Sequence, residues 1–260
     1  MGTWDRIYPA CPKISDRLKF FASGWGDKAR GDEVIESFRS WVLQSKYHDR
    51  ELRESIVLDR KEGSSSAEGS FISPLAHYLP PESATARFRV LLPPGSNPKG
   101  VVILFPGIGD QSFIYRRVML SRHLLAQNVA VVLIVPPMYQ ERRPQGQTLH
   151  FVTTVELLLL QTVALVAEAL LVLSWLRSTA FPQALLGVAG LSWGGTCAAC
   201  CGAMWDGPIA ISSFIASASF DPLLEGALDG KCQVPIRILR HPIRMPRCGA
   251  LGPLLCRFFT

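Results

Sequence analysis

Three uninterrupted runs of apolar residues beyond residue 100 predict strands that are buried on both faces. The runs are Val101–Phe105, Val129–Val135 and Leu185–Ala189, and β-branched residues are frequent in them. Strands without apolar–polar alternation are typical of a parallel sheet with helices on both sides. Because helical stretches separate the runs, we expect right-handed βαβ crossovers. The helices are expected at Ser112–Ala126, at Thr153–Leu176 and from Gly194, and a further strand is expected at Ile209–Ala216.

The chain before residue 100 has a different pattern, which predicts antiparallel strands. In one segment Phe88 alternates with Arg87 and Arg89, as in a strand with one buried face. We therefore expect an α/β fold with a mixed, mostly parallel central sheet and flanking helices. The expected elements are a helix at Asp32–Gln44, strands at Glu54–Asp59, Phe71–Leu79 and Ala86–Leu92, and a flexible run at Gly63–Ala67.

Charge and cysteine content narrow the classes of function. All acidic residues lie at or before Asp229, so residues 231–260 carry the whole net charge of +6. The arginines of this tail have no interleaved aromatic platform, and we expect no nucleic-acid partner. Seven cysteines are too few for a disulfide scaffold, and their odd number favours reduced thiols and an intracellular protein. The compartment is not determined, and both the cytoplasm and the mitochondrion are compatible with the sequence. We divide the chain into an N-terminal helical segment (1–53), an α/β core (54–230) and a disordered tail (231–260).

One segment, Phe151–Trp175, is apolar enough to be weighed as a membrane span. Glu156, Gln161 and Glu168 interrupt it, and its charge-free runs fall short of the ~18 residues that a span needs. The sequence therefore predicts a buried core helix here. The N-terminus, Met1–Arg6, has no apolar stretch typical of a secretory signal. Peripheral contact with a membrane stays open.

The strongest chemical signal is Gly190-Leu191-Ser192-Trp193-Gly194-Gly195, which matches G-x-S-x-G between a predicted strand and a predicted helix. A sharp strand-to-helix turn strains the serine backbone and leaves no room for side chains two residues away, which explains the glycines. The turn raises the Ser192 hydroxyl above the sheet edge. The helix N-terminus and the Trp193 N–H beneath it are suited to stabilise an oxyanion. The motif predicts that Ser192 is a nucleophile.

A second glycine turn, Phe105-Pro106-Gly107-Ile108-Gly109-Asp110, directly follows the first apolar run. In hydrolases with a G-x-S-x-G turn, such a segment supplies the other oxyanion donor. We expect that donor to be the Ile108 N–H, with Gly107 and Gly109 allowing close approach of the backbone. Asp110 is expected to cap the helix that follows.

These residues resemble the family of α/β-hydrolase domain-containing protein 18. The resemblance implies the α/β-hydrolase fold and a serine esterase or lipase that cleaves a lipid or other acyl ester without a metal or cofactor. It implies Ser192 as nucleophile and Gly107, Ile108 and Trp193 as the oxyanion hole. Members usually have Met where this chain has Trp193, which we expect to narrow the pocket mouth. The matching stretches are Phe21–Gly26, Gly69–Pro80, Ala86–Pro93, Gly107–Asp110, Arg116-Arg117 and Gly190–Gly195.

The resemblance also implies that the triad acid and histidine lie in a C-terminal part that this chain lacks, so the last strands of the sheet are expected to be missing. In this fold the acid and then the histidine follow the serine. The candidates weighed are Asp221, Glu225, Asp229 and His241. We take Asp221 and His241 as triad partners, although no predicted strand positions His241. The alternative is a non-catalytic α/β-hydrolase-like protein that acts, if at all, by binding.

Two arginine pairs follow the carboxyl ends of predicted parallel strands, which form the ligand-binding edge of such sheets. Their guanidinium groups are suited to bind an anionic headgroup of the substrate. The alternative is that they lie on solvated helix faces. The four residues are Arg116, Arg117, Arg142 and Arg143.

The remaining metal-ligating residue types have structural interpretations. Cys197, Cys200 and Cys201 share one helix face and are expected to be small buried thiols rather than a metal site. His77 is interpreted as structural, and His150 as a surface or packing residue. The oligomeric state stays open.

Overall fold

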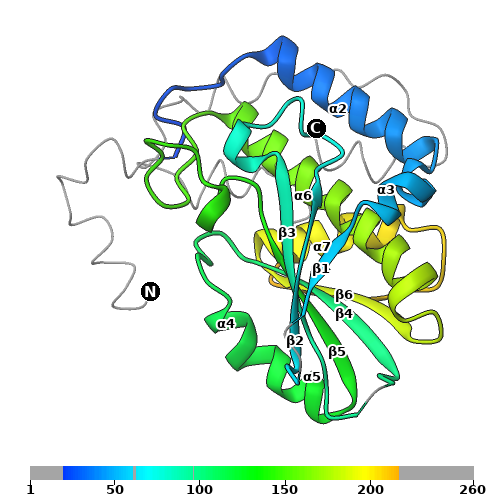
Figure 1. The fold of residues 1–260 in the computed structure, drawn as a ribbon. Coiled ribbons are helices and arrows are strands. Elements are labelled where there is room, and N and C mark those ends of the chain that lie inside the picture. Colours follow the sequence, from blue (N-terminus) through cyan, green and yellow to red (C-terminus); the bar gives the residue numbers. More distant parts are fainter. Residues whose placement is uncertain (1–19, 61–62, 96, 217–260) are drawn as a thin grey trace, which may run out of the picture.

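The computed structural model describes residues 20–60, 63–95 and 97–216. In these residues the chain forms one seven-stranded sheet with the strand order β1-β2-β3-β5-β4-β6-β7 (Figure 1). The non-consecutive order of β3, β5, β4 and β6 reflects the crossovers that the alternation of strands and helices predicts. The strands are β1 (Val57–Asp59), β2 (Ser66–Ile72), β3 (Thr85–Leu91), β4 (Gly100–Phe105), β5 (Val129–Val135), β6 (Leu185–Leu191) and β7 (Ala210–Phe214).

The direction of strand pairing changes at β3. Strand β1 pairs with β2, β2 with β3 and β3 with β5 in antiparallel register. The pairs β4–β5, β4–β6 and β6–β7 are parallel. The sheet is therefore mixed, as expected, and its parallel part carries the three apolar runs. All five residues of β7 are exposed at the edge of the sheet.

The helices flank this sheet. Helix α2 begins after Asp27, whose side chain accepts a hydrogen bond from the Arg30 N–H, and it buries Val34 and Phe38 on one face, as its spacing predicts. The other α-helices are α3 (Arg50–Glu54), α4 (Ile114–Arg116), α5 (Arg122–Ala126), α6 (Val155–Trp175) and α7 (Trp193–Met204), and α2 itself spans Lys28–Leu43. Short 3-10 turns are η2 (Lys46–His48), η3 (Pro81–Ser83) and η5 (Gln140–Arg142), and π turns are η4 (Arg117–Ser121) and η6 (Leu176–Ala180).

Several predicted boundaries differ from the structure. The helix expected at Asp32–Gln44 begins at Lys28, and the strand expected at Glu54–Asp59 begins only at Val57, because Glu54 is the last residue of α3. The strand expected at Phe71–Leu79 ends at Ile72, because Ser73-Pro74 starts a series of turns and Pro74 has no N–H for a ladder. The run Gly63–Ala67 was expected to be flexible, but β2 begins at Ser66. The helix expected at Ser112–Ala126 begins at Ile114 and contains the π turn η4.

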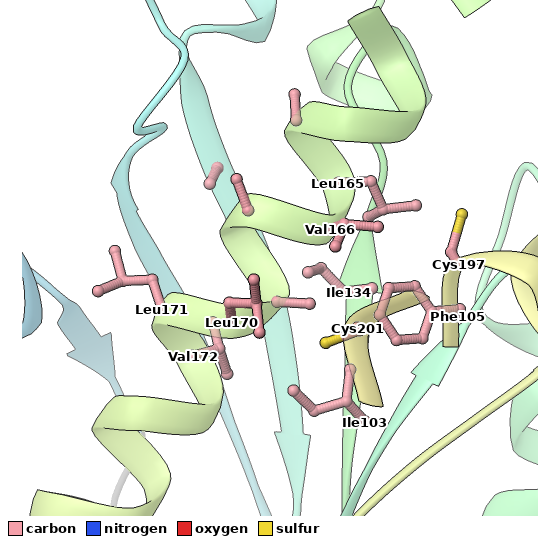
Figure 2. Close-up of a cluster of buried hydrophobic side chains, with 14 of the residues drawn as sticks. Ile103, Phe105, Ile134, Leu165, Val166, Leu170, Leu171, Val172, Cys197 and Cys201 are labelled. Carbon is pink, nitrogen blue, oxygen red and sulfur yellow. The ribbon is translucent and has the colours of Figure 1, made fainter. Parts of the chain in front are cut away.

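Helix α6 is the core of the molecule. It packs against α2, α3 and α7, and 94% of its most apolar window is buried within the protein. It is the one described helix that is long and apolar enough to cross a membrane, a test that core helices also pass. Figure 2 shows Leu165 and Val166 on the side of this helix that faces Ile134 of β5 and Cys201 of α7, whereas Leu171 points to the other side. The buried-helix prediction is confirmed.

The two faces of the sheet are covered unequally. One face carries the large cluster around α6, to which Ile103 and Val132 contribute. The alternate strand residues, including Leu104 and Leu133, point to the opposite face and form a small second cluster. There the partly buried Leu120, Leu124 and Leu125 of η4 and α5 cover them. Figure 1 shows α4 and α5 apart from the other helices.

Candidate active site

Ser192 alone forms the turn between β6 and α7. Strand β6 ends at Leu191 and α7 begins at Trp193, and Ser192 has φ 56° and ψ −124°. A residue other than glycine rarely adopts this region, and such strain is typical of functional sites. The Ser192 N–H donates to the Phe214 carbonyl of β7 at 2.8 Å, and the Ser192 carbonyl accepts from the Thr196 N–H at 3.1 Å. The serine is exposed, so this backbone geometry presents it to solvent.

The glycines on either side are required by backbone contacts. A Cβ on Gly190 would overlap the Gly194 carbonyl and lie 2.8 Å from the Gly195 nitrogen. A Cβ on Gly194 would overlap the Pro106 carbonyl oxygen and lie 2.7 Å from that of Phe105. A Cβ atom cannot lie closer than 3.0 Å to a backbone atom that is unable to move. The prediction that side chains at positions 190 and 194 would collide with the turn is therefore confirmed.

The Gly107 turn lies beside the Ser192 turn. The parallel register places Phe105, the last residue of β4, opposite Gly190. A Cβ on Gly107 would be 3.3 Å from the Leu191 carbonyl oxygen. Within the described parts of the chain, no acceptor is bonded to the Ile108 N–H. The first N–H groups of α7, that of Trp193 included, have no acceptor within the helix. Two neighbouring turns therefore carry the N–H groups that were expected to stabilise an oxyanion.

The Trp193 side chain lies inside the protein. Its indole N–H donates to Thr162 Oγ of α6 at 3.0 Å, and its ring stacks on that of Tyr139 with centroids 6.3 Å apart. Only 5% of the residue is exposed. The expectation that this tryptophan narrows a pocket mouth is therefore wrong. Its side chain anchors the start of α7 to α6.

Arg116 is buried and bonded within the protein. Its guanidinium donates to Asp110 at 2.7 Å and to the carbonyls of Leu104 and Ile134 at 3.0 and 2.8 Å. Burial lowers the pKa of Arg116, and the Asp110 carboxylate opposes this shift. Asp110 was expected to cap the next helix, but α4 has no side-chain cap and Asp110 pairs with Arg116 instead. This pair ties the ends of β4 and β5 together.

Arg142 is completely buried, and so is its partner Glu168 of α6. Two guanidinium nitrogens donate to the two Glu168 oxygens at 2.8 and 2.7 Å. The same nitrogens donate to the carbonyls of Val135 and Ser83 at 2.6 and 2.7 Å. Both alternatives considered for Arg142, an anion contact and a solvated arginine, are therefore wrong. Glu168 is an acidic residue within an otherwise apolar helix, and this sequence feature could have indicated that it has a buried cationic partner.

Arg117 and Arg143 differ from these two arginines. Arg117 is exposed on η4, and Arg143 is half-buried just after η5. Of the four arginines, only this pair keeps a side chain at the surface. Of the four arginines predicted to contact an anionic headgroup, only Arg117 and Arg143 stay candidates.

Two residues of the loop after β5 also lie at the Gly107 turn. The Gly109 N–H donates to the Tyr139 hydroxyl at 3.2 Å. The His150 ring carbon Cε1 lies 3.4 Å from where a Cβ on Gly109 would be. His150 Nδ1 is buried without a partner, and burial lowers the pKa of His150. The sequence contains no motif that marks either residue. His150, interpreted as a packing residue, does stack on Phe151.

The proposed triad partners Asp221 and His241 lie outside the described residues, as does the tail at 231–260. Asp206 also follows Ser192 in the chain and is not among the predicted triad candidates. Its carboxylate accepts from His48 Nε2 at 3.0 Å, while His48 Nδ1 bonds to Ser174 at 2.9 Å. Asp206 thus has a partner on η2.

The cysteines of α7 are buried free thiols, as predicted. Burial raises the pKa of all three, that of Cys200 to about 12. No group of three or more His, Cys, Asp or Glu side chains in the described residues is arranged to hold a metal ion. These thiols pack as small apolar groups in the core.

A mixed sheet with this strand order, helices on both faces and a strained serine between β6 and α7 defines the α/β-hydrolase fold. Residues 18–240 match the family model described as alpha/beta hydrolase domain containing 18. The chain belongs to this family.

One solved structure with a TM-score above 0.5 has the same fold, and two more distant ones are reported beside it. Acetyl xylan esterase 1 from Thermoanaerobacterium sp. JW/SL YS485 is similar with a TM-score of 0.53 and 13% identity, over 85% of this chain and 71% of the esterase. Dienelactone hydrolase from Anabaena variabilis ATCC 29413 has a TM-score of 0.37 and 19% identity, over 48% and 54% of the two chains. XC6422 from Xanthomonas campestris, an α/β serine hydrolase without lid, has a TM-score of 0.36 and 16% identity, over 54% of this chain and 56% of XC6422. The matches to these last two span about half of their length.

Proposed function

We propose that the protein is a serine hydrolase that cleaves a lipid or other small acyl ester. In this proposal the Ser192 hydroxyl attacks the ester carbonyl and passes its proton to a base. The resulting oxyanion accepts hydrogen bonds from the Ile108 and Trp193 N–H groups. Collapse of the intermediate breaks the ester C–O bond, the base returns the proton to the leaving alcohol, and an acyl-serine is left; water then hydrolyses it to the carboxylic acid and free Ser192. Membership in an α/β-hydrolase family supports a hydrolase of this kind.

The observation that carries the proposal is the backbone conformation of Ser192. A positive φ in a serine, kept by glycines that no larger residue can replace, has a steric cost that a simple connection would avoid. The serine is exposed at the carboxyl end of β6, the edge at which parallel sheets bind ligands. The Gly107 turn beside it supplies a second N–H within the same small region.

The base and its acid belong to the proposal as well. We propose Asp221 and His241, which follow Ser192 in the order acid then histidine that this fold uses. A base must come within hydrogen-bonding distance of the serine hydroxyl. The proposal therefore requires His241 to reach the exposed face of the Ser192 turn.

A second candidate function is binding without turnover. It is favoured by Asp206, the acid of the described residues 193–216, because its carboxylate is bonded to His48 and does not orient a base at Ser192. Without a base the turn would bind an ester carbonyl at its N–H groups and leave it intact. Reactivity of the serine separates the two candidates.

The test is to incubate the purified chain with a fluorophosphonate and to measure its intact mass, with Ser192→Ala as control. Circular dichroism must first show that both samples are folded. A single adduct on the wild type alone supports the hydrolase. Loss of the adduct in Asp221→Asn and His241→Gln, with Glu225→Gln as the matched control that keeps it, supports the proposed partners. A folded wild type that stays unlabelled contradicts catalysis and favours binding.

A further inference from the structure

The helical segment at residues 114–126 has an apolar outer surface, which is unusual for a surface helix. Ile114, Tyr115, Val118 and Met119 are exposed by 70%, 50%, 52% and 54%. Spacings of one, four and five residues place them on one side of a helix. A surface helix normally presents polar residues to water and apolar ones to the core. We call this surface, together with Arg117 and Arg122, the outer face of α4–α5.

The apolar residues of the outer face are not the ones that pack on the sheet, because the opposite side of the segment already covers it. Leu120, Leu124 and Leu125 pack against the small cluster of β3, β4, β5 and β6. Arg116 and Ser121 are buried, and the Ser121 hydroxyl donates to the Arg116 carbonyl at 3.0 Å across the π turn. The segment is therefore apolar on both sides, and its outer side has no partner in the described parts of the chain. Exposed apolar patches of this kind mark interaction sites.

The charge around this surface is positive. Arg117, Arg122 and His123 are exposed, and neither arginine forms an ion pair with a described residue. Between Asp110 and Glu141 the chain has no acidic residue, and the Asp110 carboxylate is directed to Arg116. Arginines beside exposed apolar and aromatic residues, without acids, are typical of helices that lie in the interface of an anionic membrane.

We propose that the outer face of α4–α5 docks onto an anionic lipid surface. Ile114, Val118 and Met119 enter the boundary between headgroups and acyl chains, Tyr115 lies at the headgroup level, and the two arginines contact lipid phosphates. The segment begins shortly after the Gly107 turn, so docking brings the Ser192 edge of the sheet near the bilayer. The docking is independent of the proposed chemistry and does not require an active serine.

The test is sedimentation of the full chain with vesicles of phosphatidylcholine and phosphatidylserine, compared with phosphatidylcholine alone. We expect wild type and Ser192→Ala to bind the anionic vesicles equally and neutral vesicles more weakly. Val118→Glu/Met119→Glu should weaken binding at least ~10-fold, because two apolar side chains are lost from the interface. Arg117→Gln and Arg122→Gln should each weaken it about fivefold, the expected effect of one cation near an anionic surface.

Matched controls lie on the other side of the sheet. Leu43→Glu replaces a residue of α2 that is 56% exposed, and Lys46→Gln removes an exposed cation of η2. Neither should change binding. The proposal is overturned if the folded wild type does not bind anionic vesicles. That result would favour another occupant of this face, either a different part of the chain or an acidic peptide. Equal effects of the control and outer-face variants would also overturn it.

Discussion

Gly194 at the start of α7 lies against the Pro106 carbonyl at the end of β4, so closely that a Cβ on residue 194 would overlap that oxygen. The contact joins the two turns that we propose to bind the oxyanion. Because both partners are backbone atoms, neither can move away without displacing a strand or a helix. The geometry of the proposed site therefore requires that residue 194, like residue 190, has no Cβ.

Gly194→Ala should destabilise the fold by about 2–4 kcal/mol, the range of strongly strained core substitutions. Gly31→Ala is the matched control, since its Cβ would meet only Glu156 Cγ at an ordinary 3.8 Å and it lies inside α2. Alanine there should raise the free energy of unfolding by about 0.5–1 kcal/mol through helix propensity. Urea unfolding measures both. Equal effects of the two substitutions would contradict the contact.

Ser192→Gly should stabilise the protein by about 1 kcal/mol, because glycine adopts a φ of 56° without the strain that serine bears. Part of that gain is offset by the greater freedom of glycine in the unfolded chain. Ser192→Ala keeps the strain and should leave the thermal midpoint near that of the wild type. If glycine lowers the midpoint below that of alanine, Ser192 is not strained.

Breaking the buried ion pair should be costly. Arg142→Met leaves the Glu168 carboxylate without its arginine partner in a fully buried site, and we expect a loss of about 3–5 kcal/mol. The double variant Arg142→Met/Glu168→Leu should lose less than the sum of the single losses, because no charge stays buried. Arg50→Met, at the exposed pair with Glu54, should leave the unfolding midpoint unchanged. Additive losses at Arg142 and Glu168 would show that the pair is not coupled.

His150 should make the protein less stable in mild acid. Burial lowers its pKa in the folded state, so the unfolded chain binds a proton first when the pH falls below about 6.5. Stability therefore decreases as the pH falls through the unfolded pKa and stops decreasing below the folded pKa. His150→Phe keeps a ring beside Phe151 and removes the titration. The check is the free energy of unfolding between about pH 7.5 and 5, which should fall less steeply in the variant.

The strands of the parallel half could be predicted almost to the residue. Val129–Val135 is β5 as expected, because a strand buried on both faces leaves a continuous apolar run, here between Asn128 and Pro136. The Ser192 turn could be predicted for a similar reason, since its glycines are required by local backbone geometry. Structural features that are determined by residues adjacent in the chain can be predicted from a short stretch of sequence.

The partners of the charged residues could not be predicted. Arg142 and Glu168 are 26 positions apart, and they meet only because of the rotation of α6 about its axis and the path of the loop after β5. His48 and Asp206 are separated by 158 positions, and their contact depends on how η2 packs against α6 and on the Tyr47 hydroxyl, which donates to the Met204 carbonyl at the end of α7. His150 reaches Gly109 from a loop without a periodic pattern. The sequence shows which groups must find partners, whereas the tertiary packing decides which partners they find.

The position of α6 in the chain has a consequence for the order of synthesis. Chains leave the ribosome from the N-terminus, so early segments are available for packing before later ones are made. Helices α2 and α3 and strands β1 to β5 all precede α6, while β6 and α7 follow it. The most apolar helix therefore emerges when most of the surfaces that cover it already exist. The interval in which an insertion machinery can mistake it for a membrane anchor is correspondingly short.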